Sequence, residues 1–297
     1  MPTDRQLARI TSTRARSPEK IAEAAMSRVR PNSAFDDEER DLIIAADHPA
    51  RGALRAGPQP MAMANRRELL QRLCVALSRP GVTGVLGTAD ILEDLLLLGA
   101  LNELSVFGSM NRGGLAGAVF ELDDRFTGYD VRSIARSGFD GGKMLLRIDH
   151  NDERTARTLA TCAQAVTDLA EEKLVAMVEP FVSHRVDGRL ANDLSVEAAT
   201  TAVTVASGLG ATSAYTWLKI PVIGDGGDAM AHVLGATTLP TLLLGGEVEV
   251  DQDRTYERWS KALRNPTVRG LVVGRSLLYP ADGDVAKAVD IAARLLL

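Results

Sequence analysis

Short apolar runs alternate with amphipathic helical patterns along the chain from about residue 39 onward. The runs are rich in Val, Ile and Leu and end at Gly, Pro or charged residues, which is typical of buried strands. We expect strands at 41–48, 82–88, 141–150, 174–181, 215–222, 240–248 and 268–278, with one further strand between 104 and 124. Helical spacing of apolar residues predicts helices at 65–78, 89–101, 153–173, 195–210, 227–237, 254–264 and 284–297.

The number of strand and helix units predicts a closed barrel. Residues 104–110 and 116–124 flank the glycine-rich segment 111–117, so we expect one of them to be a barrel strand and the other to belong to an excursion. Counted this way the chain has eight units, and a (β/α)8 TIM barrel typically needs about 250 residues. A doubly wound open sheet is the alternative, but the turn after the first run lacks the Gly-x-Gly-x-x-Gly pattern usual there.

Residues 1–38 are predicted to form an N-terminal helical extension ahead of a catalytic barrel at 39–297. Apolar residues such as Leu7, Ile10 and Ile21 recur in it at helical spacing. We expect the extension to cap the barrel or a neighbouring subunit, so a homo-oligomer is compatible with the sequence. A partly disordered tail is the alternative.

Charge and composition argue against several classes of protein. A net charge of -5 and a pI near 5.5 disfavour nucleic-acid binding, which needs an excess of Lys and Arg on one face. The apolar run at 94–101 is too short to span a membrane, and we find no signal-peptide pattern. Cys74 and Cys162 fall in amphipathic helical patterns and are expected to be buried free thiols. These features predict a cytoplasmic protein.

Polar residues and glycines gather at the predicted carboxyl ends of the strands, where TIM barrels carry their active sites. They are Asp47, His48, Arg147, Asp149, His150, Glu179, Lys219, Gly245, Gly246, Gly274, Arg275 and Ser276. Residues two apart share one face of a strand. On the fourth strand Lys143, Arg147 and Asp149 share a face and are expected to point into the barrel, because the alternate positions are fully apolar.

Lys219 stands at the end of an apolar run, close to Pro221, where a charged side chain is costly to bury. An amine in a water-poor cavity beside another cation shifts toward its neutral form, and lowering a lysine pKa from about 10.4 to about 7.5 takes about 4 kcal/mol. Only the neutral amine attacks a carbonyl. We therefore predict Lys219 as the nucleophile of a Schiff-base enzyme, Lys143 as the neighbouring cation and Glu179 as the proton carrier. The alternatives are a solvent-reaching lysine and a structural ion pair.

The glycines of the last two strands suit phosphate binding. Loops after the seventh and eighth strands of such barrels commonly hold phosphate through backbone N–H groups. We expect Gly245, Gly246, Gly274, Arg275 and Ser276 to bind the phosphate of a small-molecule substrate. Arg147 is expected to bind the substrate from the fourth strand.

The segments AADHPARG, GGKMLLRIDHNDE, LVAMVEPF, YTWLKIPV and VVGRS together resemble class I aldolases of the tagatose-bisphosphate aldolase and deoxyribose-phosphate aldolase superfamily. More narrowly, the chain is similar to aldolase-like barrel proteins associated with inositol catabolism. The resemblance implies a Schiff-base role for Lys219 and proton shuttling by Glu179. It also implies that Lys143 is a second active-site lysine, that Asp47 orients substrate hydroxyls, and that Gly246, Gly274 and Arg275 hold phosphate.

These features predict a carbon–carbon lyase that needs no metal or other cofactor and cleaves a phosphorylated ketose or keto sugar acid. The acids at 247 and 249 are expected to repel a second phosphate, which favours a monophosphorylated substrate. A metal-dependent lyase or hydrolase is an alternative, with His48, His150 and His184 near Asp47 and Asp149. A non-catalytic barrel that binds a sugar phosphate is another.

Overall fold

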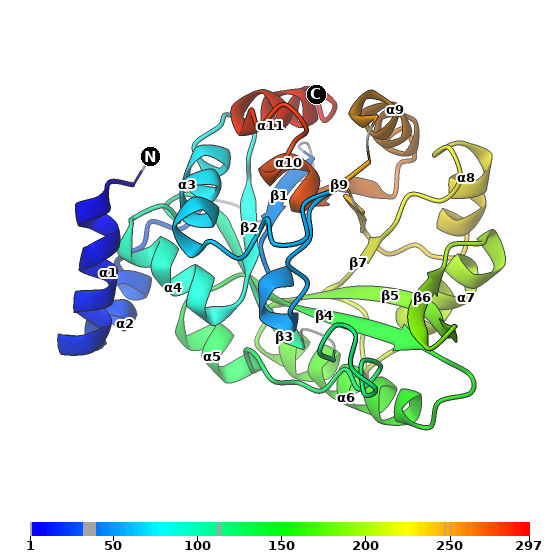
Figure 1. Ribbon diagram of the computed structural model, residues 1–297. Helices are drawn as coiled ribbons and strands as arrows, with labels where there is room; N and C mark the ends of the chain where they lie inside the picture. Colours follow the sequence, from blue (N-terminus) through cyan, green and yellow to red (C-terminus); the bar gives the residue numbers. More distant parts are fainter. Residues whose placement is uncertain (1, 32–39, 112–113, 247, 250) are drawn as a thin grey trace.

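A closed ring of parallel strands forms the centre of the protein in the computed structural model, which describes residues 2–31, 40–111, 114–246, 248–249 and 251–297 (Figure 1). The strands of the described residues are β1 (Asp41–Ala45), β2 (Gly84–Gly87), β3 (Ser105–Asn111), β4 (Gly141–Ile148), β5 (Val175–Val186), β6 (Arg189–Asp193), β7 (Thr216–Ile220), β8 (Thr241–Leu244) and β9 (Val268–Val273). All neighbours pair in parallel except β5 and β6, and the β1–β9 and β4–β5 pairings close the ring. The prediction of a (β/α)8 barrel is confirmed.

Helices surround the outside of this ring (Figure 1). They are α1 (Asp4–Arg16), α2 (Glu19–Ser27), α3 (Arg66–Leu77), α4 (Ala89–Leu97), α5 (Val131–Arg136), α6 (Arg154–Glu171), α7 (Val196–Ser207), α8 (Asp228–Leu234), α9 (Gln252–Ala262), α10 (Arg275–Leu278) and α11 (Val285–Arg294), with a short 3-10 helix, η1 (His48–Arg51). Asn65, Ser195 and Asp251 begin α3, α7 and α9 by accepting a backbone N–H of the first turn. Within the described residues, no helix has the length and apolar content of a membrane span.

The two faces of each strand pack into different layers, as the alternation of the sequence predicts. On β1, Ile43 and Ala45 belong to the cluster inside the barrel, whereas Leu42 and Ile44 pack under the helices. The interior cluster consists of Ile43, Ala45, Leu86, Phe107, Val175, Met177, Leu242 and Val272, with Trp217 against it. Because residues two apart share a face, this layer extends from Met177 to Glu179 and from Trp217 to Lys219. An apolar floor therefore lies beneath the charged residues.

Several segments depart from the predicted elements. Helix α5 was not predicted, and the strand predicted at 268–278 ends at Val273 and is followed by α10. β5 extends five residues past the predicted end at 181 and pairs with β6 in an antiparallel hairpin. The turn of this hairpin is formed by Asp187 and Gly188, which both have positive φ. A two-residue Asp-Gly hairpin turn requires this backbone conformation. Of the two segments that could form the third strand, 104–110 corresponds to β3. Residues 116–124 form turns in the excursion. Cys162 is buried and Cys74 half-buried, and both are free thiols.

The N-terminal extension is helical and packs on the barrel through α4. Arg14 pairs with Glu93 and Asp94 of α4 at 2.7 and 2.8 Å. Arg28 is buried and donates to the backbone carbonyls of Leu104 and Gly138 at 2.6 and 2.8 Å. The extension thus packs against α4 on the outside of the barrel. The predicted domain boundary at 38/39 lies outside the described residues and stays a prediction.

We expect Arg28→Met to lower the free energy of unfolding by about 3 kcal/mol, because it removes the buried partner of Asp140 and of several carbonyls. Arg28 Nη2 lies 3.6 Å from Asp140 Oδ2, and the Asp140 side chain is only 14% exposed. Urea denaturation measures the change, and Arg16→Met, at an exposed position of α1, is the control, with less than about 0.5 kcal/mol expected. Equal stability of the two variants would show that Arg28 does not anchor the extension.

Candidate active site

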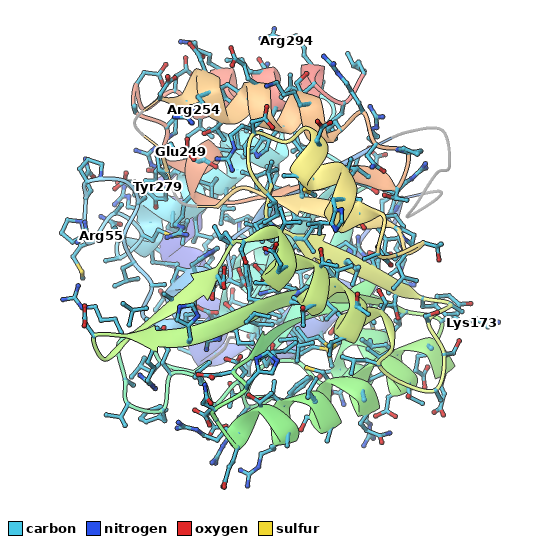
Figure 2. All side chains as sticks on the ribbon, turned by 90° about the vertical axis from the view of Figure 1, so that its right-hand side faces the viewer. Arg55, Lys173, Glu249, Arg254, Tyr279 and Arg294 are labelled. Atoms are coloured by element: carbon cyan, nitrogen blue, oxygen red, sulfur yellow. The ribbon has the colours of Figure 1, made fainter. Side chains whose placement is uncertain are left out.

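A cavity of about 270 Å³ opens at the carboxyl ends of the barrel strands. Figure 2 shows this end of the barrel on the side of Arg55, opposite Lys173, which precedes β5. The cavity is lined by Ala45, Asp47, His48, Arg51, Lys143, Leu145, Arg147, Glu179, Phe181, Asn192, Leu194, Lys219, Pro221, Leu244, Gly245, Gly246, Val272, Gly274 and Arg275. Of the residues predicted to act in catalysis or to bind substrate or phosphate, all except Ser276 therefore line one cavity.

The carboxylate of Glu179 lies between two buried lysines. Glu179 Oε2 is 3.1 Å from Lys219 Nζ and 2.5 Å from Lys143 Nζ. Lys143 Nζ is also 3.0 Å from Asp47 Oδ2. The side chains of Lys143 and Lys219 are 4% and 3% exposed. We call these four residues, Asp47, Lys143, Glu179 and Lys219, the lysine–carboxylate chain. Asp47 follows β1, and the other three lie within β4, β5 and β7.

The two carboxylates of the chain are held ionised by the lysines. Burial alone would raise the pKa of Glu179, but Lys143 and Lys219 lower it to about 2. Burial acts in the same direction on Asp47, and Lys143 and His48 lower its pKa far below the ordinary value. Ser109 Oγ also donates to Asp47 Oδ2 at 3.4 Å. Both acids are thus anions at neutral pH.

The two lysines differ in charge environment. Burial would lower the pKa of Lys143, but Asp47 and Glu179 raise it above the ordinary value. Burial and the ammonium of Lys143 lower the pKa of Lys219. Among the described residues, Glu179 is the one carboxylate in contact with Lys219, and it is shared with Lys143, so it does not fully offset this lowering. Of the two amines, Lys219 is the one that can lose its proton and attack a carbonyl carbon.

Backbone glycines and Arg275 form the rim of the cavity next to Lys219. Gly246 has a φ of +67°, which favours glycine. A Cβ at Gly274 would lie 2.5 Å from the carbonyl oxygen of Ala45, so the close approach of β9 to β1 requires glycine there. Arg275 Nη2 donates to the carbonyl of Gly246 at 3.4 Å. Ser276 is buried beside this rim and does not line the cavity, so its predicted contact with the substrate has no support from the geometry.

Arg147 points inward from β4, as predicted, and also anchors the excursion. Its Nε donates to Asp124 Oδ2 at 3.0 Å, and its Nη2 contacts both Asp124 and the carbonyl of Glu121. The Asp124 side chain is fully buried and also accepts the N–H of Gly114 at 3.1 Å. Substrate binding by Arg147 stays a prediction, while its loop contact is a role that the sequence did not reveal.

The residues of the metal-site alternative do not converge. His150 and His184 are exposed, whereas His48 lines the cavity. Asp149 was predicted to point into the barrel, but it accepts the N–H of Asn151 at 2.9 Å and does not line the cavity, because the strand ends at Ile148 and the chain turns there. Among the described residues, no group of three or more His, Cys, Asp and Glu side chains could hold a metal ion.

The hairpin supplies cavity residues that the sequence reasoning missed. Asn192 and Leu194 line the cavity because β6 returns along the extended end of β5. The Asp187–Gly188 pair between two extended segments is the signal that predicts such a hairpin. The expected repulsion from residue 249 is also weakened, since Glu249 pairs with Arg258 at 2.9 Å. Residue 247 lies outside the described residues.

We expect Lys143→Met to raise the pKa of Lys219 by about one unit or more. The substitution removes a neighbouring cation, and the carboxylate of Glu179 then interacts with Lys219 and no longer with a second lysine. The measurement is the pH dependence of Lys219 acylation, followed by mass spectrometry. Lys261→Met, at a lysine of α9 that pairs with Asp225, is expected to change nothing. A midpoint that stays in place or falls in Lys143→Met would contradict the proposed coupling.

Comparison with known proteins identifies a family and a fold. A family model described as Cgl0159-like matches residues 39–293. The crystal structure of Cgl0159 from Corynebacterium glutamicum is 50% identical, covers 100% of this chain and 98% of that one, and gives a TM-score of 0.95. No curated protein gives a significant match.

Two solved aldolases share the barrel at low identity. A Schiff-base-forming fructose-1,6-bisphosphate aldolase is 18% identical, with a TM-score of 0.67 over 93% of this chain and 100% of that chain. An archaeal fructose 1,6-bisphosphate aldolase is 17% identical, with a TM-score of 0.66 over 93% of this chain and 98% of that chain. At this identity the likeness shows a shared fold. The match to the family model and the 50% identity establish that the chain belongs to the Cgl0159-like family.

Proposed function

We propose that this protein is a class I aldolase, a carbon–carbon lyase that cleaves a phosphorylated ketose or keto sugar acid through an imine on Lys219. The observation that carries the proposal is the contact of Lys219 Nζ with Glu179 Oε2 at 3.1 Å, in a buried site where a second lysine disfavours the charged amine. The barrel shared with solved fructose-bisphosphate aldolases is consistent with this chemistry.

Imine formation uses Lys219 and Glu179. The neutral amine attacks the ketose carbonyl carbon, and the carbonyl oxygen becomes the hydroxyl of a carbinolamine. During attack one amine proton moves to that oxygen. Glu179, which touches Lys219 Nζ, is positioned to take the proton that the Lys219 ammonium loses before attack and to return it to the hydroxyl, which leaves as water. The resulting iminium ion withdraws electrons from the neighbouring carbon–carbon bond and so favours its cleavage.

Lys143 and Asp47 hold the substrate and set the charge of the site. The ammonium of Lys143 stays protonated between two carboxylates and can donate to substrate hydroxyl oxygens. The carboxylate of Asp47 can accept a hydrogen bond from a hydroxyl, in line with the role implied by the resemblance. Neither group has to change its charge during the reaction.

A phosphate of the substrate fits the rim of the cavity. Gly245, Gly246 and Gly274 line this side of the cavity with backbone close to Arg275, and Arg51 also lines it. Anions bind well to guanidinium groups beside exposed backbone N–H groups. A monophosphorylated substrate from inositol or another sugar catabolism remains the favoured class within this proposal.

Borohydride reduction in the presence of a panel of phosphorylated ketoses and keto sugar acids tests the proposal. We expect one member to leave a stable adduct on the peptide that contains Lys219, with release of an aldehyde product when borohydride is absent. Lys219→Met should abolish both the adduct and the aldehyde product while the protein remains folded, since the substitution removes the amine of one side chain and leaves the rest of the protein unchanged.

The position of the adduct decides the outcome. An adduct on Lys143 would contradict the assignment of the nucleophile. Binding of a panel member without an adduct and without turnover would favour the non-catalytic alternative. Activity that requires an added divalent cation would favour the metal-dependent alternative.

A further inference from the structure

We infer that His48 is a further catalytic residue, which carries a proton between the substrate hydroxyl and the substrate carbon after the imine has formed on Lys219. This inference rests on the proposed function. The lysine–carboxylate chain accounts for imine formation, and each of its carboxylates is already engaged by an ammonium group. Carbon–carbon cleavage needs a base next to the substrate, and His48 lines the same cavity without a role in the chain.

The backbone holds His48 in one place. It is the first residue of η1, directly followed by Pro49, and its carbonyl accepts the N–H groups of Gly52 and Ala53. Gly52 closes this turn with a φ of +76°. The imidazole is therefore fixed at the carboxyl end of β1, one residue after Asp47.

The two ring nitrogens of His48 differ in their surroundings. Its Nδ1 is buried and lies 3.5 Å from Asp47 Oδ1, with no hydrogen-bond partner within the described part of the chain. The side chain as a whole is 21% exposed, so the opposite edge of the ring, which carries Nε2, is the part that the cavity reaches. The negative charge of Asp47 favours the proton on Nδ1 and leaves Nε2 free to accept one.

The charges around His48 link its basicity to the substrate. Burial lowers the pKa of His48 to about 3, Asp47 opposes this, and Arg275, Arg51 and Lys219 lower it further. The imidazole is therefore neutral at neutral pH. A phosphate bound by Arg51 and Arg275 would offset two of these cations, so the pKa of His48 rises when an anionic substrate occupies the rim.

The step is balanced in protons and electrons. His48 Nε2 takes the proton of the hydroxyl on the carbon that departs, and the O–H electron pair forms the carbonyl of the aldehyde product. The electron pair of the broken carbon–carbon bond forms an enamine and neutralises the iminium nitrogen. His48 then returns its proton to the enamine carbon, which regenerates the iminium ion for hydrolysis by water.

Dihydroxyacetone phosphate separates the two stages, because it forms an imine and can exchange its carbon-bound hydrogen with solvent. With wild-type protein we expect a borohydride-trapped adduct on Lys219 and deuterium incorporation from D2O. In His48→Gln the adduct should form, while deuterium exchange slows by at least about 100-fold. His232→Gln, an exposed histidine of α8, serves as the matched control with unchanged exchange.

A second variant guards against a structural effect. His48→Ala should show the same loss of exchange, and added imidazole should restore part of it, which a merely structural role would not allow. Exchange in both variants within about threefold of wild type, with the adduct still formed, would overturn the role of His48 and leave the proposed function intact. Absence of an adduct on wild-type Lys219 both with dihydroxyacetone phosphate and with every member of the substrate panel would overturn the proposed function and this inference together.

Discussion

The carboxylate of Glu179 shared between two buried lysines is the interaction on which the site depends. A buried ammonium without a partner is too costly to keep, and a lysine with a full carboxylate of its own would stay protonated. Lys143 contacts two carboxylates at 3.0 and 2.5 Å, whereas Lys219 contacts a carboxylate that is already engaged. Because of this unequal sharing, Lys143 keeps its positive charge, whereas the pKa of Lys219 is lowered and its neutral form becomes accessible.

The barrel makes this arrangement possible because four different strands deliver the four side chains. Asp47 follows β1, whereas Lys143, Glu179 and Lys219 lie within β4, β5 and β7 and point into the ring from its interior face. Beneath them lies the apolar interior cluster, which keeps water away from the lower side of the site. The lysines therefore lie within hydrogen-bond distance of their acids at buried positions, where each charge has a strong effect on its neighbours.

Much of this could be predicted from the sequence because strand alternation is strict in a barrel. The spacing from Met177 to Glu179 and from Trp217 to Lys219 placed both charged residues on the interior face, and the structure confirms it. Alternation ends where a strand ends, and so the inward orientation predicted for Asp149 was wrong. The pairing of Arg147 with Asp124 depends on a contact between the barrel and the excursion that no local pattern records. Asn192 reaches the cavity through the hairpin that Asp187 and Gly188 signal.

The central claim is that Lys219 carries a lowered pKa while its neighbour Lys143 carries a raised one. Nuclear magnetic resonance of protein labelled with carbon-13 at lysine Cε, with the two signals assigned from Lys219→Met and Lys143→Met, measures both values directly. We expect the Lys219 signal to titrate below the ordinary lysine range and the Lys143 signal to titrate above it. A Lys219 that titrates at or above the ordinary lysine pKa would contradict the account.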